Sequence, residues 1–229
     1  MHDLRAEFPV LERLAYLNTG SNGPVPRRAV EAAAESMRLQ LAEGRGDRVH
    51  FEATAERIDW LRGRVAGLLG CETAEVALTG STTDGVNAVI AALDLGRGDD
   101  VLTSDEEHPG VLAPLAALRK RRGVSVRMVP VAELGGEVRP QTRLVACSHV
   151  SWITGAVADT AALAAGPALV LLDGAQGLGA VPAARCWRRP TGFRWTCKRC
   201  CSPTTITTTW WRRRPGRGRR CSPTRSRPS

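Results

Sequence analysis

A repeated alternation of strand and helix patterns through the first 184 residues most constrains what this chain can fold into. Apolar residues recur at helical spacing over residues 26–43, 52–69, 82–93, 109–122 and 160–165. Short apolar or alternating runs predict strands over residues 75–79, 100–103, 124–129, 143–147 and 168–172. The last run reads Ala-Leu-Val-Leu-Leu, which is typical of a strand buried on both faces of a parallel sheet. The pattern predicts an α/β fold in which helices cover both faces of a mostly parallel sheet.

Charge divides the chain into two parts. The whole sequence of 229 residues carries a net charge of +9. Residues 185–229 hold 13 Arg, one Lys and no acidic residue, and so carry +14. The first 184 residues hold the other 18 basic and all 23 acidic residues, a net charge of −5. We therefore predict a mildly acidic globular unit over residues 1–183 and a basic segment over residues 184–229.

The basic segment shows no sustained amphipathic period, and it is rich in Arg, Thr, Pro, Ser, Cys and Trp. A GC-rich gene read out of frame gives such a composition, so we expect a frameshifted segment without a packed core. One alternative is a genuine basic tail that binds nucleic acid non-specifically, with arginines on phosphates and Trp210 and Trp211 on bases. Another is a zinc site at Cys197 and Cys200 with Cys186 and Cys221, although a single CxxC is a weak signal.

Cysteine use and hydropathy bear on the compartment. The first 184 residues hold only Cys71 and Cys147, which is typical of a reducing environment. The N-terminus lacks the apolar core of a signal peptide, and polar or helix-breaking residues interrupt the most apolar stretch, 153–172. We expect a cytoplasmic protein without a membrane span.

A Gly/Ser/Thr turn over residues 80–85 follows a predicted strand and opens a predicted helix. The first amides of a helix lack partners and the helix dipole is positive there, so Thr82 and Thr83 are candidates for binding an anion. The alternative is an ordinary helix cap, with Thr82 as the cap and Asp84 stabilising the dipole.

Two more candidates follow strands, where ligands bind in open α/β sheets. His108 comes after the strand at 100–103, and Asp173 comes directly after the apolar strand at 168–172. A buried carboxylate needs a cationic partner or hydrogen-bond donors, and a protonated pyridine nitrogen is one such partner. The alternatives are a surface histidine that caps the next helix and an Asx turn at Asp173.

Five short motifs occur in the order and spacing of one enzyme family: Tyr16-Leu17-Asn18-Thr19-Gly20, Thr79-Gly80-Ser81-Thr82-Thr83-Asp84, Glu107-His108-Pro109, Ser148-His149-Val150-Ser151 and Leu172-Asp173-Gly174-Ala175-Gln176. Over residues 7–183 the chain resembles the class V aminotransferases, the branch of fold-type I enzymes that includes cysteine desulfurases and isopenicillin N epimerase-like proteins. The resemblance implies the cofactor pyridoxal 5'-phosphate (PLP), an amino-acid substrate and a homodimer in the intact family.

The resemblance also implies roles for single residues. Thr82 and Thr83 would hold the cofactor phosphate, and His108 would stack on the pyridine ring. Asp173 would pair with the protonated ring nitrogen, and Gln176 would bind on the side of the ring hydroxyl. Ser148 and Ser151 would lie beside the ring.

The sequence departs from the family at two positions. Trp152 stands where desulfurases often have Asn, which favours the epimerase-like or aminotransferase-like branch. The family's Schiff-base lysine lies about 25 residues beyond the aspartate. Lys198 has that spacing, but its context, Trp195-Thr196-Cys197-Lys198-Arg199-Cys200, does not match. We therefore assign no catalytic residue, and we expect a truncated enzyme that is inactive as written.

Overall fold

The computed structural model describes residues 4–181 and 209–210. Its longer helices are α2 (Arg27–Glu43), α3 (Arg48–Leu69), α4 (Thr82–Ala92), α5 (Pro109–Arg122) and α6 (Thr160–Ala165). The strands are β1 (Asp100–Ser104), β2 (Ser125–Val129), β3 (Thr142–Ser148), β4 (Leu169–Asp173) and β5 (Thr209–Trp210). Short turns of helix are α1 (Val10–Arg13), η1 (Leu4–Glu7), η2 (Thr73–Glu75) and η3 (Val131–Glu133).

The strands form one sheet in the order β2-β1-β3-β4-β5. β1 to β4 are mutually parallel, and only the two-residue β5 pairs antiparallel, against the end of β4. The carboxyl ends of β1, β3 and β4 therefore lie at the same edge of the sheet, where Ser148 is the register partner of Asp173. This arrangement confirms the predicted parallel α/β sheet.

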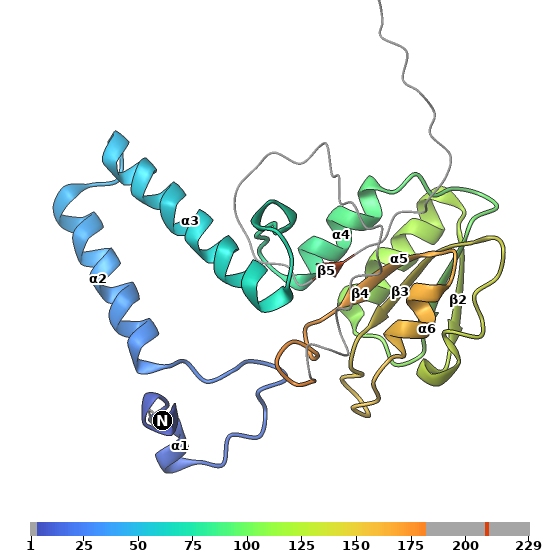
Figure 1. Cartoon of the computed structure of the whole chain (residues 1–229), viewed down its shortest axis with the longest axis horizontal. Coiled ribbons are helices and arrows are strands. Elements are labelled where there is room, and N and C mark those ends of the chain that lie inside the picture. Colours follow the sequence, from blue (N-terminus) through green and yellow to red (C-terminus); the bar gives the residue numbers. More distant parts are fainter. Residues whose placement is uncertain (1–3, 182–208, 211–229) are drawn as a thin grey trace, which may run out of the picture.

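Helices cover both faces of this sheet, as predicted (Figure 1). On one face, Val86 of α4 and Leu115 of α5 pack with Val101 and Leu144. On the other face, Leu163 of α6 packs in a second cluster with Leu102 and Val145. Each of these two strand residues directly follows a residue of the first cluster, so its side chain points to the opposite face. The strands read as continuous apolar runs because successive side chains point to opposite faces and both faces are covered.

One predicted strand, 75–79, is wrong. Its first residue ends η2 (Thr73–Glu75), and residues 76–79 form no strand in the structure. A strand needs a neighbour with which to share backbone hydrogen bonds. β2 and β4 are the outer strands of the parallel sheet, and the other side of β4 is paired with β5. The run at 75–79 pairs with no described strand, so its apolar pattern alone does not make it one.

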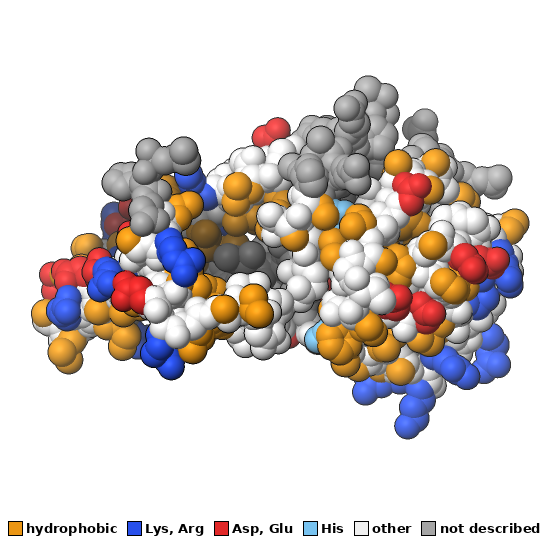
Figure 2. Space-filling view, turned by 90° about the horizontal axis from the view of Figure 1, so that it is seen from below, with side chains coloured by type: hydrophobic (Ala, Val, Ile, Leu, Met, Phe, Trp, Pro, Cys, Tyr) orange, Lys and Arg blue, Asp and Glu red, His pale blue; other side chains and the backbone are white. Residues whose placement is uncertain are grey.

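α2 and α3 extend away from the α/β body (Figure 1). Asp47 caps α3 by accepting a hydrogen bond from the His50 amide, and the helix begins four residues before the predicted start. No residue of α2 is buried, and Val30, Met37 and Leu41 are exposed. Hydrophobic side chains are visible on this part of the molecule in the space-filling view (Figure 2).

The basic segment over residues 184–229 lies outside the described part of the chain, apart from the backbone of Thr209 and Trp210. The predictions that fall there are the frameshift, the nucleic-acid alternative, the zinc site and Lys198. Within residues 4–181 and 209–210, no helix has the length and hydropathy needed to cross a membrane.

Candidate active site

The N-terminus of α4 is built by a serine cap. Ser81 has an extended backbone, and its side chain accepts a hydrogen bond from the Asp84 amide at 3.1 Å. The alternative of an ordinary helix cap is correct in kind but names the wrong residue, because Ser81 is the cap and Thr82 is already the first residue of the helix. Thr82 and Thr83 are both half-buried in the first turn. Their hydroxyls are therefore near the amides that a helix leaves unpaired at its start.

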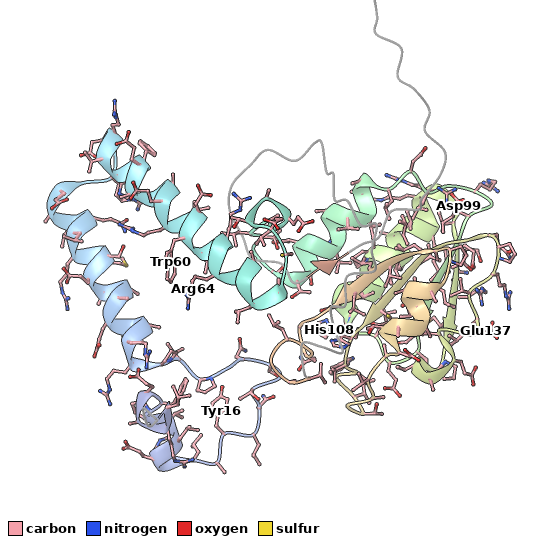
Figure 3. All side chains as sticks on the ribbon, viewed as in Figure 1. Tyr16, Trp60, Arg64, Asp99, His108 and Glu137 are labelled. Carbon is pink, nitrogen blue, oxygen red and sulfur yellow. The ribbon has the colours of Figure 1, made fainter. Side chains whose placement is uncertain are left out.

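His108 caps α5 and lies at the end of the sheet opposite Asp99 and Glu137 (Figure 3). Its Nδ1 accepts a hydrogen bond from the Gly110 amide at 3.0 Å, so the capping alternative describes this nitrogen correctly. The residue is exposed, and its ring stands edge-on to Trp152, with centroids 5.5 Å apart and an interplanar angle of 80°. The cap thus fixes the imidazole in a position accessible to a ligand.

Gly110 allows the starts of α4 and α5 to approach closely. A Cβ on Gly110 would lie 2.6 Å from Thr83 Oγ1 and 3.0 Å from His108 Nδ1. The first distance is shorter than Cβ contacts in proteins and the second is tight, so a side chain at this position would force Thr83 to move and would crowd His108. Two sequence candidates, Thr83 and His108, are therefore brought together by a glycine that the motif analysis did not single out. The sequence did hold a signal for this close approach, because glycine is unfavourable inside a helix and Gly110 is the second residue of the helix predicted over residues 109–122.

Asp173 is the last residue of β4 and is only 6% exposed. Its Oδ1 accepts a hydrogen bond from the Ala175 amide at 2.9 Å, as the Asx-turn alternative predicts. Burial raises the pKa of this carboxyl, and the charge of nearby His108 opposes that shift. In residues 4–181, no other hydrogen bond or ion pair to this carboxylate is found. A buried carboxylate with so few partners suits a cationic ligand group such as a protonated ring nitrogen.

Gln176 connects two of the sequence motifs. Its Nε2 donates a hydrogen bond to the carbonyl of Gly20 at 2.9 Å, across 156 residues. A Cβ on Gly20 would lie 3.1 Å from Gln176 Oε1. The N-terminal motif that contains Tyr16 is thus held against the loop that follows Asp173.

Glu107 is a buried residue of this edge that sequence reasoning did not select. Its carboxylate accepts hydrogen bonds from Ser104 Oγ at 2.5 Å, from the Ser148 amide at 2.8 and 2.9 Å, and from Ser148 Oγ at 2.7 Å. Burial is the largest influence on the Glu107 pKa and raises it, and the charge of Asp173 acts in the same direction. The only sequence signal was its place beside His108.

The segment after β3 is hydrogen-bonded to the end of β4. The His149 amide donates to the Asp173 carbonyl at 2.8 Å, and burial lowers the pKa of the His149 side chain. Ser148 ends β3, whereas Ser151 lies in the following loop and accepts hydrogen bonds from the Ile153 and Thr154 amides. Ser151 therefore holds the turn that carries Trp152.

A hollow of about 410 Å³ lies elsewhere, along α5 and β2. None of the predicted site residues lines it, but Lys120 does. Lys120 is twelve residues beyond His108 on α5, about 18 Å along the helix axis. The one lysine among residues 4–181 is therefore too far from the site edge to react with a ligand held there.

Known proteins match the same part of the chain. A family model described as aminotransferase class-V matches residues 15–184. A probable cysteine desulfurase of Methanothermobacter thermautotrophicus is 32% identical over 191 residues, 77% of this chain and 47% of that protein. A cysteine desulfurase of Klebsiella pneumoniae (strain 342) is 34% identical over 199 residues, 76% of this chain and 49% of that protein. The chain spans about half the length of the curated relatives it matches.

Solved structures agree with the sequence matches. The cystine C–S lyase C-DES, in complex with its product cysteine persulfide, has a TM-score of 0.73 and 32% identity, covering 76% of this chain and 51% of that one. A C-DES variant with glycine covalently linked to its PLP cofactor has a TM-score of 0.74, covering 78% of this chain and 51% of that one. These relatives are desulfurases and a C–S lyase, in contrast to the branch that Trp152 favoured. The expected resemblance and the expected PLP-dependent family are confirmed, and the chain belongs to the aminotransferase class-V family.

Proposed function

We propose that residues 1–183 are the cofactor-binding part of a PLP-dependent enzyme that acts on an amino acid. The observation that carries this proposal is Asp173, a buried carboxylate at the carboxyl end of β4 with one hydrogen bond from Ala175. It lies at the same edge of the sheet as Glu107 and His108, where the strands β1 and β3 end. Carboxyl ends of parallel strands are where α/β folds bind ligands.

The residues of this edge fit the groups of PLP. The first turn of α4, with Thr82 and Thr83, would bind the phosphate through helix amides and hydroxyls. The exposed ring of His108 would lie on the pyridine ring, and Gln176 would bind on the side of the ring hydroxyl. Asp173 would pair with the ring nitrogen, where its charge keeps a proton on that atom. When bound, the cofactor supplies an electron sink for chemistry at the substrate α-carbon.

The chain's own residues prepare this arrangement. Gly110 lets the starts of α4 and α5 approach, so that phosphate and ring contacts come from adjacent helices. The hydrogen bond from Gly110 to Nδ1 orients His108, and the ring also makes a T-shaped contact with Trp152. The hydrogen bond from Gln176 to Gly20 brings the N-terminal motif to the same edge.

An enzyme of this kind needs a lysine amine that reacts with the cofactor aldehyde and moves a proton at the substrate. Lys120 is too distant, and the sequence around Lys198 does not match the context of the family's lysine. We therefore propose non-covalent binding of PLP and no turnover for this chain as written. Cysteine is the first substrate to test, because the relatives are named for it.

The proposal includes the organisation of the whole chain. Residues 184–229 form a separate basic segment, the intact protein is a cytoplasmic homodimer, and its reaction class is transamination, desulfuration or epimerisation. The charge division between the two segments supports this boundary.

Titration of the full chain with PLP, followed by its absorbance, tests the cofactor site. We expect saturable binding that Asp173→Asn weakens about tenfold or more, because a charged partner is lost. Asp105→Asn is the matched control, since it removes an exposed carboxylate near the same edge. Equal binding by the wild-type chain and Asp173→Asn would overturn the assignment of the ring-nitrogen partner.

Borohydride reduction of the PLP-treated chain, followed by peptide mapping, tests the absence of a covalent cofactor. We expect no stoichiometric pyridoxyl group on any lysine. A stoichiometric adduct on Lys198 that is lost in Lys198→Ala would contradict the inactive state and identify the missing lysine.

A further inference from the structure

Glu107 differs from the neighbouring acidic residues in its environment. Asp105 is exposed and Glu106 half-buried, whereas Glu107 is 4% exposed. A buried carboxylate is unfavourable unless hydrogen bonds satisfy it. Glu107 has such bonds from two different strands, from Ser104 at the end of β1 and from Ser148 at the end of β3.

The bonds of Glu107 connect the two sides of the proposed cofactor site. Glu107 directly precedes His108, which caps α5. Ser148, which donates its amide and its hydroxyl to Glu107, is the register partner of Asp173. The next amide, that of His149, donates to the Asp173 carbonyl. A short path of hydrogen bonds therefore runs from the residue beside His108 to the strand end that carries Asp173.

We propose that Glu107 is a positioning residue that sets the separation of His108 and Asp173, and with it the fit of the cofactor ring. This inference rests on the proposed function, since it concerns the same site. Ser104 donates a hydrogen bond to one oxygen of the Glu107 carboxylate, and Ser148 donates to the other. The Glu107 side chain therefore acts through these neighbours rather than on a ligand.

The hydrogen bonds also predict which substitution the site tolerates. In Glu107→Gln, an amide oxygen in the Oε2 position can still accept from the Ser148 amide and hydroxyl, and an amide nitrogen in the Oε1 position can donate to Ser104 Oγ, so the Ser148 amide keeps one of its two contacts. In Glu107→Ala, the buried donors of Ser104 and Ser148 lose their acceptor and the strand ends lose their link. The role assigned to Glu107 therefore requires that glutamine rescues what alanine destroys.

NMR and hydrogen exchange on the full chain test this role without cofactor. For Glu107→Ala we expect the His108 ring and Gly110 amide resonances to shift, and the Ser148 amide to exchange about tenfold faster or more. Resonances of α6 stay in place because that helix lies on the other side of the sheet. Glu107→Gln and the control Asp105→Asn keep the wild-type His108 resonances.

PLP titration gives the second readout. We expect Glu107→Ala to weaken binding about tenfold or more, Glu107→Gln to stay within about threefold of the wild-type chain, and Asp105→Asn to leave it unchanged. If Glu107→Ala does not fold, Ser104→Ala replaces it, because this variant removes one donor and keeps the carboxylate. A smaller loss in the same direction is then expected.

Two results separate this inference from the proposed function. The positioning role of Glu107 would be overturned if Glu107→Ala bound PLP with wild-type affinity while Asp173→Asn still lost binding. If Glu107→Ala does not fold, the same result in Ser104→Ala would overturn it. Absence of PLP binding in the wild-type chain would overturn the proposed function, and the His108 and Ser148 measurements would then decide the link by themselves. An unchanged His108 signal in the folded alanine variant would refute it.

Discussion

Replacing Gly110 by alanine tests the packing of α4 against α5 directly. The new Cβ would lie 2.6 Å from Thr83 Oγ1, so one of the two groups must move by most of an ångström. Thr83 is β-branched and has only two favourable χ1 angles in a helix, which limits how far its hydroxyl can rotate away. Overpacking of this kind destabilises by about 1–3 kcal/mol. Alanine regains about 0.5–1 kcal/mol of helix propensity, which leaves a net loss of about 0.5–2 kcal/mol.

Urea denaturation followed by circular dichroism measures this loss, with Gly67→Ala as the matched control. Gly67 lies in α3, and a Cβ there would have no atom within 4 Å, so the control should gain about 0.5–1 kcal/mol. The double variant Gly110→Ala with Thr83→Ala should recover about 1 kcal/mol of the loss, since the clashing hydroxyl is gone. The reasoning is refuted if Gly110→Ala is as stable as the wild-type chain, or if Thr83→Ala gives no recovery.

Three further predictions concern single contacts and are measured by denaturation. Ser81→Ala should destabilise the chain by about 1 kcal/mol through loss of the α4 cap, and Ser81→Asn should restore it; equal stability of all three would contradict the cap. Arg127→Met should destabilise it by about 3 kcal/mol, because Asp100, 3% exposed and held by Arg127 at 3.0 Å, loses its cationic partner; a loss below 1 kcal/mol would contradict this. Burial lowers the folded-state pKa of His149, so between that pKa and about 6.5 the unfolded chain binds more protons and stability falls as the pH is lowered through this window. In His149→Asn this part of the pH dependence should disappear, whereas an unchanged slope between pH 7.5 and 5.5 would contradict it.

Local patterns were sufficient for most of the fold. The predicted helix at 109–122 has the observed bounds, because Pro109 suits a helix start and Gly123, with a φ of 67°, suits its end. The apolar runs around Leu144 and Leu171 predicted strands because a parallel sheet covered on both faces leaves no polar positions along them. The strand predicted at 75–79 was wrong because a strand depends on a neighbour that local sequence does not contain.

Sequence alone also indicated which residue types follow the strands. Its short motifs further indicated the family that the chain resembles. His108 and Asp173 were visible because each follows an apolar run, and both lie at the same sheet edge because parallel strands end together. What only the tertiary structure decided is how these residues are held. The contacts of Glu107 with Ser148 and of Gln176 with Gly20 join segments 41 and 156 residues apart, and no periodic pattern encodes such pairs. The close approach at Gly110 is of the same kind, because whether a glycine is needed depends on which atom of another helix stands where its side chain would be.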